Sequence, residues 1–162
     1  MRFGDYIRKA GIVPVAISYE KDPCDLAKAR ELHEKAANSN YEKPPGADAR
    51  SMYLGLRKEK GRIHIAIGKP LKGEYADEKD VALEIDQVIH SLYKLWPTNY
   101  IACDVLNDSE AYAPLYSENE RAGFLKRFEV EREEVRRLAL QMYARPAINK
   151  QALLGEAGDG FR

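Results

Sequence analysis

The sequence predicts an α/β fold: a small mixed β-sheet of about three strands that includes a hairpin, packed by helices and followed by an α-helical C-terminal extension. One observation is the apolar, β-branched run at residues 12–19, which suits a strand buried on both faces. A second is the strict alternation of isoleucine with other residues at 63–67. A third is the broad apolar stripe at residues 77–96, which recurs at helical spacing.

A short amphipathic segment precedes the apolar run, and the run itself contains one proline. The spacing of apolar residues predicts a helix over residues 3–10, and Gly11 stands where a helix C-cap glycine belongs. Proline cannot donate to a strand ladder. Pro14 is therefore expected at the start of the strand, at a bulge or on an edge.

A helix is predicted over residues 22–37, directly after the strand. Asp22 has the side chain of an N-cap, and Pro23 stands at the first helical position, where its missing N–H costs nothing. Asp25 adds negative charge at the helix N-terminus, which the helix dipole favours. The segment 38–48 contains Pro-Pro-Gly and is predicted to be a loop.

The next segment is predicted to be a β-hairpin with arms at residues 50–57 and 62–67. The turn is expected at residues 58–61, where Gly61 is available for a positive φ. In the second arm the three isoleucines fall on one face of the strand, opposite the face that carries His64.

The segment at residues 77–96 has the clearest helical pattern in the sequence. Asp77 is its expected N-cap, and the Trp96-Pro97 pair ends it because a residue before proline is pushed out of the α region. Helical patterns follow from that point, except at residues 112–116, which are expected to be irregular. We therefore expect residues 1–97 to form the α/β part and residues 98–162 to form a helical extension packed on it.

Local signals also divide the C-terminal extension. Ser117 and Glu120 fit a capping box at the start of one helix. A charged helix is expected over residues 131–143, with a break at Pro146. Residues 155–162 are expected to fray.

Composition and charge exclude several classes of protein. The 162 residues include 26 Lys plus Arg and 26 Asp plus Glu, so the formal net charge is zero. A chain without net positive charge is not expected to bind nucleic acid through bulk electrostatic attraction. No apolar run is long enough to span a bilayer, and the N-terminus lacks the apolar region of a signal peptide. Cys24 and Cys103 have no metal spacing and are interpreted as free thiols of a cytoplasmic protein, with a disulfide as the lesser alternative.

Sequence motifs for known catalytic chemistry are absent. There is no Gly-rich phosphate loop, no GxSxG nucleophile elbow and no zinc-ligand spacing, so no metal site or bound cofactor is expected. Each of His33, His64 and His90 is a candidate base or ligand-facing residue, although a structural role on its helix or strand is favoured. Asp22 and Asp25 could act as paired carboxylates or ligate a metal, but helix capping already accounts for both.

A small basic cluster remains open to two interpretations. It consists of Lys58, Lys60, Arg62 and Lys69, around the expected hairpin. These side chains could bind an anionic lipid headgroup or a phosphate. A solvated hairpin turn explains them equally well.

Five stretches of the sequence together resemble the glycerolipid acyltransferases, the family that includes lysophosphatidate acyltransferase, and in particular one bacterial branch of it. The segment Ile12-Val13-Pro14-Val15-Ala16-Ile17 resembles the fourth sequence block of that family. The others are residues 18–25, 50–55, 60–71 and 96–102. The resemblance covers residues 7–154, nearly the whole chain.

The family's catalytic pair is missing from the chain. Family members use a histidine and an aspartate separated by four residues, and the histidine deprotonates the acceptor hydroxyl that attacks an acyl thioester. The residues five positions after the three histidines are Asn38, Lys69 and Leu95, and none is an aspartate. The chain thus resembles the C-terminal part of the domain, and it is expected to have no catalytic residue and no acyl transfer by itself.

The resemblance implies a modest set of functional features. Val13, Pro14 and Val15 match the fourth block, which lies near the acyl-donor and acceptor site, and they are the expected substrate-binding residues; a role in the sheet core is the alternative. The parent reaction transfers an acyl group from acyl-CoA or acyl carrier protein to a lysophospholipid. The implied partner is a lipid substrate or a membrane surface, contacted peripherally from the cytoplasmic side of the inner membrane.

A second hypothesis is a non-catalytic α/β module that binds a lipid surface or a protein. A buried-type strand without neighbours on both sides has an unpaired apolar edge, which favours pairing with another chain. The expected partner at that edge is either a missing N-terminal half or a second copy of the chain. No nucleic-acid partner is expected.

Overall fold

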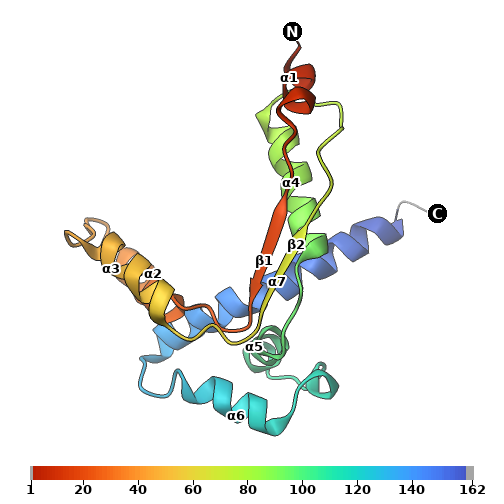
Figure 1. Cartoon of the computed structure of the whole chain (residues 1–162). Helices are drawn as coiled ribbons and strands as arrows, with labels where there is room; N and C mark the ends of the chain where they lie inside the picture. Colours follow the sequence, from red (N-terminus) through yellow and green to blue (C-terminus); the bar gives the residue numbers. More distant parts are fainter. Residues whose placement is uncertain (1, 160–162) are drawn as a thin grey trace. The chain divides into compact units, whose positions relative to one another are not determined.

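The structure of the protein, a computed structural model, describes residues 2–159. It is a mixed α/β fold in which a two-stranded antiparallel ribbon is combined with helices (Figure 1). In chain order the elements are α1 (Phe3–Ala10), β1 (Val15–Tyr19), α2 (Asp25–Ala37), α3 (Ala47–Arg57), β2 (Ile63–Ile67), α4 (Glu78–Leu92), α5 (Pro97–Asn107), the 3₁₀ turn η1 (Ala113–Leu115), α6 (Glu118–Lys126) and α7 (Glu133–Asp159).

The chain forms two compact units, and each is assembled from separate segments. Unit 1 contains residues 1–18, 63–94 and 148–162, and unit 2 contains residues 19–62 and 95–147. Each of the expected parts, 1–97 and 98–162, therefore contributes residues to both units.

Unit 1 has a small apolar core near α1. Ile7, Leu71, Tyr75 and Val81 are buried together, with Ile12 and Ile85 packed against them. The Tyr75 hydroxyl donates to Glu84 of α4 at 2.8 Å, and Arg8 of α1 donates to the Gly73 carbonyl at 3.3 Å. These contacts connect α1 and α4 to the segment that follows β2.

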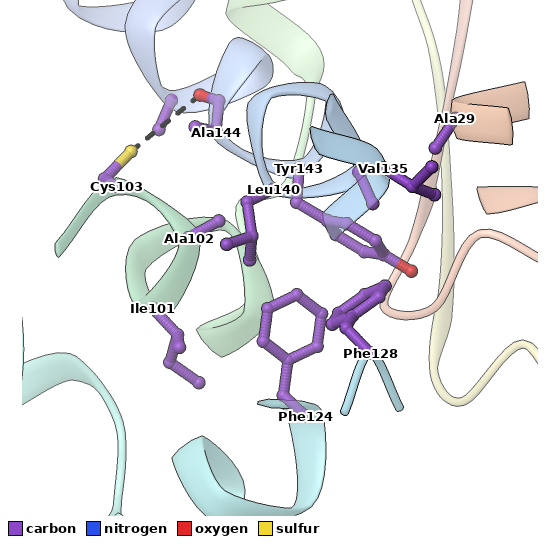
Figure 2. Packing of buried hydrophobic residues seen from close by; sticks show 12 residues of the cluster. Ala29, Ile101, Ala102, Cys103, Phe124, Phe128, Val135, Leu140, Tyr143 and Ala144 are labelled. Atoms are coloured by element: carbon purple, nitrogen blue, oxygen red, sulfur yellow. Dashed lines mark hydrogen bonds between the residues drawn. The ribbon is translucent and has the colours of Figure 1, made fainter. Parts of the chain in front are cut away.

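Unit 2 has the larger core, which consists of helix side chains (Figure 2). Phe124 and Phe128 lie edge-on to one another with ring centroids 5.2 Å apart, and Phe124 also meets Tyr143 of α7 at 4.8 Å. Such edge-to-face pairs are the favoured aromatic geometry. Ile101 and Ala102 of α5 complete this core, so α5, α6 and the first part of α7 form one packed body.

The structure contradicts the prediction of three strands. Residues 50–57 belong to α3, and β2 pairs with β1 rather than with a hairpin neighbour. Met52, Leu54 and Leu56 alternate with other residues as in a strand, but Leu, Met and Arg are good helix formers. An apolar run this short is compatible with the two-residue period of a strand and with the 3.6-residue period of a helix, and the structure is helical here.

Several helix boundaries also differ from the predictions. Helix α2 begins at Asp25, although Asp22 still accepts a hydrogen bond from the Cys24 N–H at 2.7 Å. Helix α4 ends at Leu92, before Trp96. Helix α7 continues through Pro146 to Asp159, so the predicted break and the fraying of residues 155–159 are wrong, and residues 160–162 lie outside the described part.

Packing explains why α7 continues through its proline. Pro146 removes one backbone hydrogen bond, to the carbonyl of Met142, and costs about 3 kcal/mol in a helix interior. Ala144 and Ala147, on either side of it, are almost completely buried. The burial of this face offsets the cost of the missing bond.

Other local predictions are confirmed. Asp77 caps α4 by accepting from the backbone N–H groups of Lys79 and Asp80, and Ser117 and Glu120 form the expected capping box of α6. Gly11 and Gly61 both adopt a positive φ, at 65° and 62°. Pro14 stands directly before β1, where its missing N–H removes no bond from the ladder.

Asp104 is a buried carboxylate that organises the loop after α5. It accepts from the Ser109 hydroxyl at 2.7 Å, the Tyr116 hydroxyl at 2.8 Å and the Tyr112 N–H at 3.0 Å. Burial alone would raise the pKa of this carboxyl, but the hydrogen bonds outweigh it and hold the pKa below its usual value. The ionised form of Asp104 therefore stabilises the fold.

We predict that Asp104→Asn lowers the free energy of unfolding by about 1–3 kcal/mol at neutral pH. The amide NH₂ of asparagine is a donor and would face the groups that donate to the Asp104 carboxylate, so hydrogen bonds would be lost. The folded-state pKa is depressed, so the stabilisation is present above the unfolded pKa of about 4 and is lost as the pH falls through the folded value. Denaturant unfolding as a function of pH measures this. The exposed Glu110→Gln is the control, and an equal loss in both variants would contradict the assignment.

Candidate functional site

The β1–β2 ribbon has a register that separates its side chains by size. The Gly68 N–H donates to the Pro14 carbonyl and the Glu20 N–H donates to the Arg62 carbonyl, both at 2.9 Å. In this antiparallel register Ala16 lies opposite Ala66, and Ile17 lies opposite Ile65. Small residues and His64 therefore share one face, and the large β-branched residues and Tyr19 share the other.

The small-residue face packs against α4. Pro14, Ala16 and Ser18 are buried on this face, and the Ser18 hydroxyl accepts from the backbone N–H of Lys94 at 2.9 Å. A Cβ atom added at Gly68 would lie 3.1 Å from Val88 of α4, so the close approach favours glycine there. Helix α4 can pack closely on this face because most of the ribbon side chains there are short.

The opposite face is apolar and exposed. We call it the apolar face; it consists of Val13, Val15, Ile17, Ile63, Ile65 and Ile67. Their exposed fractions range from 39 % for Val13 to 72 % for Ile67. Contiguous exposed apolar surface of this kind is typical of an interaction site, whereas single exposed apolar residues are normal.

The edges of the ribbon are open as well. The sheet contains only β1 and β2 in the described part of the chain, so each strand has an outer edge with no strand beside it. A two-stranded ribbon is marginally stable alone and gains stability from a third strand or a packed layer. The apolar face and both edges could therefore accept a β-structured partner.

The structure divides the three predicted substrate-binding residues between the two faces. Val13 and Val15 lie on the apolar face, and Pro14 is buried on the face toward α4. The prediction of a strand buried on both faces is wrong. Sequence reasoning missed that Ile17 and the three isoleucines of β2 form a surface with the valines, although their alternation was the available signal.

No histidine forms a catalytic pair in the described residues. His90 Nε2 lies 3.0 Å from the Asn149 side-chain amide, and His64 Nδ1 is buried without a hydrogen-bond partner. His33 is half-buried on α2. Within residues 2–159 none of the three lies within 4.0 Å of a carboxylate oxygen, so this part of the chain contains no His–Asp or His–Glu couple.

A buried polar network in unit 2 is the alternative place to look for chemistry. The Asp25 carboxylate is 2 % exposed and accepts from Arg127 at 2.6 Å and from the Tyr143 hydroxyl at 3.0 Å. The Tyr143 hydroxyl also accepts from the Asp22 N–H at 2.8 Å, and its pKa is raised by burial and by the Asp25 charge. The Asp25 carboxylate and the Tyr143 hydroxyl are satisfied by their neighbours, whereas the Arg127 Nε is buried without a hydrogen-bond partner. The network connects α2 to α7 and to the end of α6, and it presents no pair of groups in a catalytic arrangement.

The basic cluster is divided between the two units. Arg62 is paired with Glu20 at 2.9 Å and lies over the Trp96 ring, 4.9 Å from its centroid. Lys69 belongs to unit 1, whereas Lys58 and Lys60 belong to unit 2.

The remaining candidates have no catalytic geometry. Cys24 and Cys103 are free thiols, as predicted. Among the described residues no cluster of His, Cys, Asp and Glu is suited to a metal ion. An open cleft of about 460 Å³ in unit 1 lies between α4 and α7, but Lys150, its one charged lining residue, donates to the Tyr93 carbonyl at 2.9 Å.

Comparisons of the chain with protein-family models, with curated proteins and with solved structures found no match. None of the helices in the described part of the chain combines the length and apolar content needed to cross a bilayer.

We predict that Arg127→Met lowers the free energy of unfolding by about 3 kcal/mol, because it leaves the Asp25 charge buried without its cation. The neighbouring Lys126→Met, on an exposed position, should change stability by no more than about 0.5 kcal/mol. Denaturant unfolding measures both. Equal stability of the two variants would show that the pair is not needed.

We also predict that Ile65→Ala lowers stability by no more than about 1 kcal/mol, because the side chain is 61 % exposed. The same substitution at buried Ile7, in the same unit, should cost about 2–5 kcal/mol. A loss at Ile65 as large as that at Ile7 would mean that the apolar face is covered in solution.

Proposed function

We propose that this chain is the C-terminal scaffold of a glycerolipid acyltransferase-like domain, and that its apolar face binds the β-structured partner that carries the catalytic pair. One observation carries the proposal. Two of the five stretches that carry the resemblance, residues 12–17 and 60–71, form the two sides of one ribbon whose large side chains are uncovered.

The size of the apolar face favours a partner that adds strands over one that only covers the surface. Burial of the exposed half of six such side chains would contribute about 5–9 kcal/mol before any cost. Association of separate molecules costs about 4–15 kcal/mol in lost freedom and ordering. Face burial alone is therefore marginal, whereas a partner that also pairs with the free edge of β1 or β2 adds backbone hydrogen bonds.

The proposed role of the chain is structural support for acyl transfer. In the parent reaction an acceptor hydroxyl of a lysophospholipid loses its proton to a histidine and attacks the thioester carbonyl of acyl-CoA or acyl carrier protein. General-base catalysis of this kind contributes about 10²–10⁴ in rate. Because His33, His64 and His90 lack a carboxylate partner, the base would come from the partner, and Val13 and Val15 would contribute apolar contacts near the site.

We predict that the purified chain alone releases no thiol from acyl-CoA in the presence of lysophosphatidate. Mixing it with the separately expressed N-terminal half of a glycerolipid acyltransferase, cut before that protein's own Val-Pro-Val strand, should give a complex and thioester release. Ile65→Asp should abolish complex formation because it places a charge in the centre of the apolar face. Size-exclusion chromatography with light scattering and a thiol-release assay measure the two effects.

Leu83→Asp is the matched control, since Leu83 is 59 % exposed on α4 and Ile65 is 61 % exposed on β2. It should leave both effects unchanged. Turnover by the chain alone that one His→Ala substitution abolishes would contradict the proposal. A stable complex without thioester release would instead favour a protein-binding module with no acyl chemistry.

A further inference from the structure

Helix α3 exposes an apolar stripe. Ala49, Met52, Tyr53 and Leu56 recur at i, i+3, i+4 and i+7, which places them on one side of the helix, and we call them the α3 stripe. Met52 is 72 % exposed and Leu56 is 79 % exposed. Tyr53 is 54 % exposed as well, so the large apolar side chains of the stripe lie in solvent, whereas Leu54, outside the stripe, is half-buried.

The opposite side of α3 explains this orientation. Ser51 and Gly55 face the start of α2, where the Cys24 thiol donates to the Ser51 carbonyl across 3.6 Å. A Cβ atom added at Gly55 would lie 3.2 Å from the Cys24 sulfur. The side of α3 that carries Ser51 and Gly55 thus packs against the start of α2, and the α3 stripe lies on the exposed side of the helix.

Positive charge that is not neutralised accompanies the α3 stripe. Arg50, Arg57, Lys58 and Lys60 lie on α3 or directly after it, and none has a carboxylate oxygen within 4.0 Å among the described residues. The acidic residues of the segment are already paired with lysines outside it, Asp48 with Lys43 and Glu59 with Lys21 at 2.8 Å.

The ring of Tyr53 joins the apolar and cationic parts of this surface. Its hydroxyl accepts from Arg57 at 2.7 Å, and the guanidinium lies 5.6 Å from the ring centroid. Tyrosine beside arginine, next to exposed Met and Leu, is the composition of helices that lie at a lipid–water interface.

We propose that α3 docks the protein on an anionic lipid bilayer, with the α3 stripe inserted at the level of the headgroups and Arg50, Arg57 and Lys58 facing lipid phosphates. Charge decides the partner: an apolar groove in a protein would accept the stripe, but cations without a carboxylate partner beside it favour a surface of dense negative charge. Lys60 is held by the Leu56 and Lys58 carbonyls at the end of α3, at 3.0 and 3.1 Å, so Arg50, Arg57 and Lys58 carry most of this charge. The inference does not depend on the acyltransferase proposal, because it uses none of the apolar face of the ribbon.

We predict that the protein co-sediments with vesicles of phosphatidylglycerol and phosphatidylcholine and not with vesicles of phosphatidylcholine alone. Each cation near an anionic surface strengthens binding about fivefold, so Arg57→Gln with Lys58→Gln should weaken binding by about one order of magnitude or more. High salt should weaken it as well. Met52→Ser with Leu56→Ser should abolish sedimentation by removing the inserted side chains.

Matched controls separate this surface from the rest of the molecule. Val130→Ser removes an apolar side chain that is 91 % exposed, and Lys126→Gln with Arg132→Gln removes two exposed cations. Both should bind vesicles like the parent protein, and so should Ile65→Asp, which tests the other proposal. Circular dichroism and thermal unfolding establish that each variant is folded.

Four results would overturn the inference. The first is no sedimentation with anionic vesicles, and the second is equal loss in the stripe variants and the controls. The third is binding that does not depend on phosphatidylglycerol or salt. A stripe variant that instead converts an oligomer to a monomer would identify the α3 stripe as an interface between copies and would also contradict the inference.

Discussion

Alternation of side-chain size along β1 and β2 determines how the ribbon is used. The residues that face α4, among them Ala16, Ser18 and Gly68, are small enough for the helix to approach the strands closely. The β-branched residues point the other way and remain in solvent. A helix packed on the isoleucine side would be held further away, and the hydrogen bond between Ser18 and the Lys94 backbone would not form.

The two units solve the same problem of core formation in different ways. Unit 2 buries a set of aromatic rings from α6, the turn after it and α7 (Figure 2). It also buries the Asp25 carboxylate, which is held by Arg127 and Tyr143. Unit 1 has a small apolar cluster near α1 and leaves the largest side chains of its strands exposed. In unit 1 only the small-residue face of the ribbon is covered, by α4, and the apolar face therefore remains available for interaction.

The two proposed surfaces have different physical character. The apolar face of the ribbon has a flat backbone with free hydrogen-bonding edges, which suits another β-structure. The α3 stripe is narrow and accompanied by cations, which suits a charged and deformable surface. Each surface belongs to its own unit, and each can be altered by substitutions that leave the other intact.

The sequence by itself determined the features that depend on neighbours within a few residues. The caps of α4 and α6, the left-handed glycines at 11 and 61 and the position of Pro14 before β1 follow from short-range hydrogen bonds and steric limits. The mixed α/β class was also predictable, because the apolar periodicity of single segments is a local property of the sequence.

Only the tertiary structure decided which strand pairs with which, whether residues 50–57 are helical and which faces are buried. These outcomes depend on contacts between segments far apart in the chain, and a short apolar run is compatible with both periodicities until such contacts form. The same limit applies to Asp25, which the sequence marked as a helix-capping residue, because its partners Arg127 and Tyr143 lie more than a hundred residues away.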